Sequence, residues 1–194
     1  FGTFGSIFLL AQFFQTAQGL GPFDAGVRTL PWTAMPMLVA PIAGILGDRI
    51  GTRPLMAAGL ALQATALAWI GAVTEPSMPF GDVVVPFVMA GTGMALVFPT
   101  AAATVLASVR PEQAGKASGA TNAVREVGGV LGVAVLASVF AANGGYESPQ
   151  AFSDGVTSAL PIAVVVLAVG AVLALLVPGR GRVPAPAVPE PATA

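Results

Sequence analysis

The charged residues of this 194-residue chain divide it into six long segments that contain no charge at all. These segments are 19 to 27 residues long and occupy positions 1–23, 29–47, 54–74, 83–109, 127–146 and 155–179. About 20 apolar residues of α-helix cross the hydrocarbon core of a bilayer, because each residue rises about 1.5 Å along the helix axis. The pattern therefore predicts an all-α, polytopic transmembrane helix bundle with six spans.

The ends of the helices are predicted from the flanking charges, prolines and glycines. The six expected spans cover about residues 3–19, 27–47, 54–73, 83–108, 115–141 and 156–178. Residues 179–194 form a short stretch rich in Pro and Ala with nothing to bury, so we expect a disordered tail there.

The composition agrees with a membrane protein and excludes several other classes. Apolar residues make up 55% of the chain and charged residues only 9%, whereas a soluble domain carries about 25% charged residues. The net charge of −1 gives no basic face for a nucleic acid. There is no Cys, so thiolate metal sites are absent. There is no His, so the chain also lacks the commonest metal ligand and the commonest general base. We therefore expect no metal, no cofactor and no enzymatic activity.

The basic residues predict how the bundle is oriented. One set of connections between the spans holds six basic residues, and the other set holds only Arg28. The six are Arg49, Arg53, Arg110, Lys116, Arg180 and Arg182. Basic loops stay in the cytoplasm, so we expect a multi-pass protein of the cell membrane with both ends of this chain cytoplasmic. The chain also starts directly in an apolar run at Phe1, and we expect it to be a piece of a longer polypeptide.

The loop between the second and third spans carries the most specific pattern in the chain. Taken alone, its glycines indicate the end of a helix, and its basic residues indicate a loop that is held at the cytoplasmic surface. Its spacing, G-x-x-x-D-R-x-G-x-R, resembles the cytoplasmic signature loop of the major facilitator superfamily, and Gly44, Asp48, Arg49, Gly51 and Arg53 fill the positions. The resemblance implies a gating loop, whose acidic residue pairs with a neighbouring helix terminus when the transporter faces outward.

Two further stretches resemble one branch of that superfamily, the fourteen-span drug:proton antiporters. The pattern Q-x-x-x-G-x-x-P-x-x-A-G from Gln15 to Gly26 is similar to the first helix pair of their C-terminal half. Residues 119–134, with G-x-x-N-x-x-R-x-x-G-G-x-x-G-V-A, are similar to their penultimate helix. The resemblance implies a C-terminal six-helix half, whose partner is a missing N-terminal half of the same polypeptide.

A pair of charges lies within the fifth predicted span. Arg125 and Glu126 are about ten residues from the start of helix 115–141, near the middle of the membrane, where a charge costs at least about 2.5–3.5 kcal/mol. Adjacent helical positions point about 100° apart, so we expect each residue to have its own partner. The candidates are Asn122, one turn earlier, and Gln12 or Gln15 from the first helix. The pair is either a tie between helices or a site for substrate and proton coupling, and Glu126 would then carry the proton.

The resemblance also implies a substrate cavity, because the first and fourth helices of each half line the centre of the fold. The candidate lining residues are Gln12, Gln15, Met89, Met94, Phe98 and Thr100. A wall rich in Met and Phe with a few amides suits bulky lipophilic substrates, since Met adapts to different shapes. The alternative is that these Met and Phe side chains face lipid or pack in the core.

The sequence thus favours a secondary active transporter that exports lipophilic drugs or similar small molecules in exchange for protons. Its expected partners are the lipid bilayer, the missing N-terminal half, a small lipophilic substrate and the proton. Two alternatives remain open: a facilitator of sugars, metabolites or siderophores, and a non-transporting membrane module. A membrane enzyme is disfavoured, because the sequence shows no nucleophile with a general base.

Overall fold

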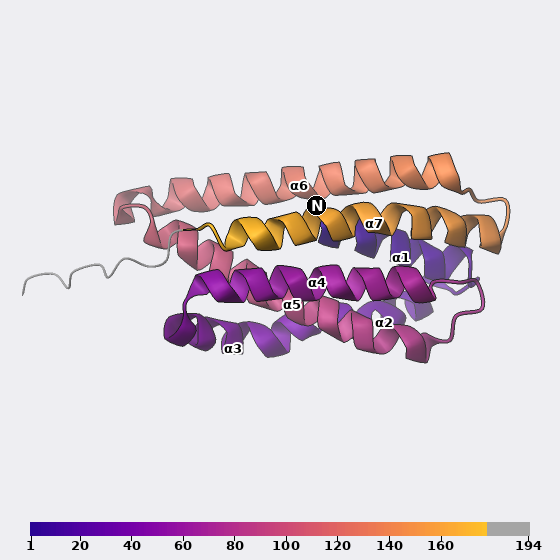
Figure 1. Cartoon of the computed structure of the whole chain (residues 1–194), viewed down its shortest axis with the longest axis horizontal. Helices are drawn as coiled ribbons and strands as arrows, with labels where there is room; N and C mark the ends of the chain where they lie inside the picture. Colours follow the sequence, from indigo (N-terminus) through magenta and orange to yellow (C-terminus); the bar gives the residue numbers. More distant parts are fainter. Residues whose placement is uncertain (178–194) are drawn as a thin grey trace, which may run out of the picture.

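The computed structural model describes residues 1–177, and these residues form α-helices joined by short turns, with no strand among them (Figure 1). The helices are α1 (Gly2–Thr16), α2 (Pro22–Thr33), α3 (Met35–Ile50), α4 (Thr52–Val73), α5 (Phe80–Ala107), α6 (Ala114–Asn143) and α7 (Pro149–Ala174), with a short 3-10 helix, η1 (Pro111–Gln113), before α6. The predicted all-α class is confirmed. The expected tail at 179–194 lies outside the described residues.

The long helices lie side by side and form one elongated bundle (Figure 1). Helix α4 packs against α5 and α7, α1 packs against α6 and α7, and α2 and α3 pack against α5. The interior is built from fully buried aromatic and aliphatic side chains, of which Phe13, Phe14, Trp32, Phe87 and Phe152 are the largest. These aromatic rings lie in edge or tilted contact with one another, so they join α1, α2, α5 and α7.

Five segments of the described chain are long and apolar enough to cross a membrane. They are Pro22–Ile50, Thr52–Val73, Phe80–Ala107, Pro111–Asn143 and Pro149–Ala174. The first predicted span, 3–19, is not among them. Helix α1 has only 15 residues, about 22 Å at 1.5 Å per residue, because the chain leaves the helix after Thr16 and turns at Gly19, whose φ is +65°.

The structure differs from the second predicted span, 27–47, in where the helix starts and in its continuity. The observed segment starts earlier, at Pro22, and is divided at Ala34 into α2 and α3. Pro31 and Pro36 lie on either side of this break, and each lacks the N–H that would continue the helical hydrogen bonds. The two helices still form one continuous apolar segment, Pro22–Ile50.

The last helix also begins earlier than the expected position 156. Helix α7 starts at Pro149, and the Ser148 side chain accepts a hydrogen bond from the Ala151 amide at 3.1 Å. Ser before Pro is a strong helix start, because the hydroxyl satisfies an end N–H and Pro suits the first turn. Asp154 therefore lies inside the helix, within its first two turns, rather than in a loop.

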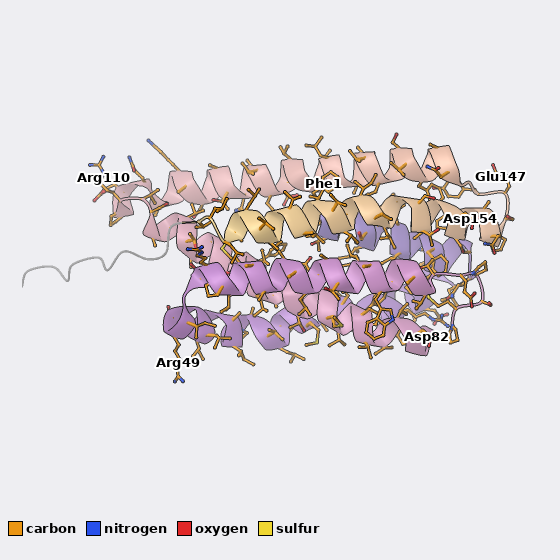
Figure 2. All side chains as sticks on the ribbon, viewed as in Figure 1. Phe1, Arg49, Asp82, Arg110, Glu147 and Asp154 are labelled. Atoms are coloured by element: carbon orange, nitrogen blue, oxygen red, sulfur yellow. The ribbon has the colours of Figure 1, made fainter. Side chains whose placement is uncertain are left out.

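The charged residues labelled in Figure 2 lie at the two ends of the bundle, whereas Arg125 and Glu126 lie within α6. Arg49 and Arg110 mark one end, and Asp82, Glu147 and Asp154 mark the other. This is the separation expected when each helix crosses the apolar layer and every connection returns to one of two water-facing surfaces. We call the first end the basic end and the second the acidic end.

Candidate functional site

A groove of about 400 Å³ lies between the second half of α5 and the first half of α6. The two helices diverge there, because α6 packs mainly against α1 and α7 and has little contact with α5. A volume of this size is within the range of sites for drug-sized molecules, about 300–1,000 Å³. The groove is therefore a candidate substrate site among the described residues.

The two walls of the groove differ in chemistry. The α6 wall carries Ser118, Thr121, Asn122 and Arg125, whose spacing of i, i+3, i+4 and i+7 puts them on one face of the helix. The α5 wall is apolar and is lined by Val97, Phe98, Ala101, Ala102, Val105 and Leu106. The groove can therefore receive a molecule with an apolar body and polar groups along one edge.

Arg125 is the charged residue that lines this groove. Its guanidinium carbon lies 5.8 Å from the centre of the Phe98 ring, which is within the range of a cation–π interaction. Its Nη2 lies 3.5 Å from Oε1 of Glu126, and the two side chains are 45% and 68% exposed. An ion pair this exposed contributes only about 0–1 kcal/mol.

The expectation that Arg125 and Glu126 each have their own partner is wrong. Their Cβ atoms point apart, but the long arginine side chain lets its guanidinium reach the neighbouring carboxylate. The amides of α1 lie elsewhere: Gln12 accepts a hydrogen bond from the Tyr146 hydroxyl at 3.2 Å, and Gln15 donates to the Ala11 carbonyl at 3.3 Å. Helix α1 begins beside Gly128 and Gly132 and runs alongside α6 towards the acidic end. The side chains of Gln12 and Gln15, in its second half, therefore lie away from Arg125.

The other predicted cavity residues are divided between the groove and the interior. Phe98 and Asn122 line the groove. Met89 packs against the core, and Met94 is half-buried. Thr100 is buried and donates to the backbone carbonyls of Leu96 and Val97. Sequence reasoning missed Ser118 and Thr121, although their helical spacing from Arg125 would have identified them.

The predicted gating loop is mostly helical: Gly44, Asp48 and Arg49 lie in the last two turns of α3, Arg53 lies in the first turn of α4, and Gly51 joins the two helices at the basic end. Gly51 has φ of +93°, a conformation that glycine adopts readily, and its amide donates to the Gly47 carbonyl at 3.0 Å. Gly44, Asp48 and Thr100 help to line a second pocket of about 230 Å³ between the end of α3 and α5. Arg49 and Arg53 are exposed, and Figure 2 shows Arg49 pointing away from the bundle. Asp48 lies near the end of α3 and faces the pocket beside α5, and its role as a latch stays a prediction.

Arg28, the single basic residue at the acidic end within residues 1–177, lies in a network of contacts. Its Nη1 donates to Gln18 Oε1 at 2.7 Å, and Gln18 donates in turn to the Met78 carbonyl at 3.0 Å. The guanidinium also lies over the rings of Phe14 and Phe80 at 5.8 and 5.4 Å. Arg28 therefore ties the α1–α2 turn to the α4–α5 connection, which the sequence did not indicate.

Comparison with known proteins places this helical bundle in a family. The family model of the Major Facilitator Superfamily matches residues 1–193. The tetracenomycin C resistance and export protein of Streptomyces glaucescens is 30% identical over 79% of this chain and 28% of its own length. The cephamycin export protein CmcT of Amycolatopsis lactamdurans is 34% identical over 93% of this chain and 37% of its own length.

A third relative is the multidrug resistance protein Stp of Mycobacterium tuberculosis, 34% identical over 73% of this chain and 26% of its own length. The chain thus spans between about a quarter and just over a third of the curated relatives it matches. The match to the family model covers almost all of the chain, and the family consists of membrane transporters rather than enzymes. The chain therefore belongs to the Major Facilitator Superfamily.

Proposed function

We propose that this chain is the C-terminal six-helix half of a secondary active transporter that exports lipophilic drugs or similar small molecules in exchange for protons. The observation that carries the proposal is the groove between α5 and α6, which combines an apolar wall with a polar face that ends in Arg125. The names of the relatives, which describe export and drug resistance, favour export over uptake of sugars, metabolites or siderophores. A non-transporting membrane module fits less well, because it needs neither the groove nor the loop at Asp48.

The partner of this half is, in our proposal, an N-terminal half of the same polypeptide. The length of the relatives supports this, since the chain covers 37% or less of each of the three. Alternating access also needs two bundles that move against each other around a site between them. The basic end of the bundle, with Arg49 and Arg110, would face the cytoplasm. Helix α1 would also cross the membrane, which brings the five apolar segments to six spans.

Glu126 is the residue in this half that we propose for proton coupling. It is the acid beside the groove, and its contact to Arg125 at 3.5 Å is long and exposed enough to be broken. Replacing Glu126 by Gln keeps the shape of the protonated acid. We therefore expect Glu126→Gln in the full-length protein to assemble normally and to flatten the pH dependence of export.

The measurement is efflux of a lipophilic dye against pH, at matched expression, for the wild type, Glu126→Gln and a control, Glu112→Gln. Glu112 lies in η1 and is exposed at the basic end, so its replacement changes the charge equally without touching the groove. An unchanged pH profile in Glu126→Gln would leave Glu126 with a structural role only. A wild-type protein that moves no dye in response to a proton gradient would overturn the proposed function itself.

The loop at Asp48 gives a second expectation. If Asp48 stabilises one conformation of the transporter, Asp48→Asn should reduce turnover by about tenfold while membrane insertion stays intact, because conformational coupling is typically 1–3 kcal/mol. The control is Asp82→Asn at the acidic end, since Arg28 is tied into the network described above. Export rates per inserted molecule decide the question, and equal rates for Asp48→Asn and the wild type would make the loop an anchor only.

A further inference from the structure

The polar face of α6 has hydrogen-bonding groups that the described part of the chain does not use. Within residues 1–177, the side chains of Ser118 and Asn122 make no hydrogen bond to another residue, although both line the groove. Thr121 donates its hydroxyl proton to the Ala117 carbonyl at 2.8 Å, which leaves its oxygen free to accept. A bound molecule can therefore form several hydrogen bonds to this one face.

The charge on that face is positive. Arg125 lines the groove, whereas Glu126, the next residue, does not. A guanidinium has five N–H donors, and within residues 1–177 the ion pair that Arg125 makes is the long contact to Glu126 at 3.5 Å. A carboxylate that approached in the plane of the guanidinium would form two short, charge-assisted hydrogen bonds and would be bound more strongly.

Phe98 fixes where such an acid would bind. Its ring lies 5.8 Å from the Arg125 guanidinium across the groove, so the cation is held near the apolar wall although its side chain is 45% exposed. The apolar body of a ligand would then contact Val97, Ala101 and Val105 while its acidic group met Arg125. The two walls thus define where the apolar part and the charged part of a bound molecule would lie.

We propose that this groove selects organic anions with an apolar body over cations of the same shape, and that Arg125 binds the acidic group while Glu126 competes with that group for Arg125. The proposal names the substrate class of the site described above and rests on the proposed function. Glu126 has a definite part in it: when the substrate acid binds Arg125, the Arg125–Glu126 pair separates.

The test uses two dyes with the same xanthene skeleton, fluorescein as the anion and rhodamine 123 as the cation. Binding of each is measured by fluorescence anisotropy to the purified full-length protein in nanodiscs at pH 7.4. We expect fluorescein to bind at least about tenfold more tightly, the ratio that corresponds to one hydrogen bond to a charged group. Arg125→Gln should remove this preference, and Arg125→Lys should restore part of it.

Glu126→Gln distinguishes competition from a structural role. If Glu126 were only structural, this variant would leave fluorescein binding unchanged. Removing the competitor should strengthen fluorescein binding by about twofold to fivefold, because an exposed ion pair contributes up to about 1 kcal/mol. Lys116→Gln is the matched control: it removes a positive charge from the same helix, at an exposed position that does not line the groove. It should leave the binding of both dyes unchanged.

Each outcome has one meaning. Equal binding of the two dyes, or tighter binding of rhodamine 123, would overturn the anion selectivity. A wild-type preference for fluorescein that persists in well-folded Arg125→Gln would overturn the role of Arg125. Export of rhodamine 123 but not of fluorescein would leave the proposed transport function in place and refute only this inference, whereas export of neither dye would count against both.

Discussion

Replacing Gly93 by leucine is expected to abolish the accumulation of folded protein. A Cβ atom at Gly93 would lie 2.5 Å from the Gly59 carbonyl oxygen and 2.7 Å from Cγ of Gln63. The nearest atom belongs to the α4 backbone, so the whole helix would have to move. Forcing extra side-chain volume into a packed interior costs roughly 1–3 kcal/mol or more, which is a large part of the stability of a typical domain.

Gln63 makes the clash at Gly93 harder to relieve. Its side chain is 2% exposed and accepts a hydrogen bond from the Thr3 hydroxyl at 2.6 Å, so it links α4 to α1 across the interior. If Gln63 moved away from a leucine at position 93, it would leave a buried amide and a buried hydroxyl without partners. Each unsatisfied buried group costs about 1–3 kcal/mol.

The control for Gly93→Leu is Gly81→Leu on the same helix. A Cβ at Gly81 would have no neighbouring atom within 4 Å, so the same substitution meets open space there. The measurement is the monodisperse peak of detergent-solubilised protein in fluorescence-detected size-exclusion chromatography, with thermal stability of the peak. Equal peaks for the two variants would show that the contact between α4 and α5 does not limit folding.

The pattern of charges predicted the middle helices well. The expected span 54–73 is α4 (Thr52–Val73), and the expected span 115–141 is within α6 (Ala114–Asn143). These helices are bounded by charges or by turn residues that are easy to recognise in a sequence. Where a long apolar segment ends at such a residue, its boundaries follow from the bilayer alone.

The break at Ala34 and the early start of α7 were not predicted, for two different reasons. Three prolines recur in the second apolar segment, and the sequence cannot say which of them interrupts the helix, because neighbouring helices decide that. At the start of α7, the charge on Asp154 favours a loop position, and the predicted span therefore begins only at 156. The Ser148 cap instead begins the helix before the charge, which then lies on the exposed end of α7.

The candidate site was predicted only in part. Phe98, Asn122 and Arg125 were named from the sequence, and the structure brings them together in one groove. Thr100 was expected in the cavity, but its hydroxyl bonds to its own helix and its side chain is buried beside the Asp48 loop. A single sequence gives the spacing of residues along a helix but not the direction in which that helix is rotated, and this rotation decides which face reaches the groove.

The second large expected effect concerns residues 1–194 taken alone, which we expect to transport nothing. Within residues 1–177, the groove is lined by α5 and α6 alone. Broad apolar faces of α3 and α6 are also exposed, including Met37 at 83% and Val130 at 69%. A second half-bundle would cover the open side and would allow access to alternate between the two surfaces of the membrane. Without it, a substrate has a binding surface but no gated path.

The most direct test of the account compares the full-length protein with residues 1–194, each reconstituted in lipid vesicles with an imposed proton gradient. We predict saturable dye movement that depends on the gradient and stops with an uncoupler for the full-length protein, and no movement above empty vesicles for residues 1–194 present in equal amount. Saturable, gradient-driven movement by residues 1–194 alone would contradict the claim that this chain is one half of a two-part transporter.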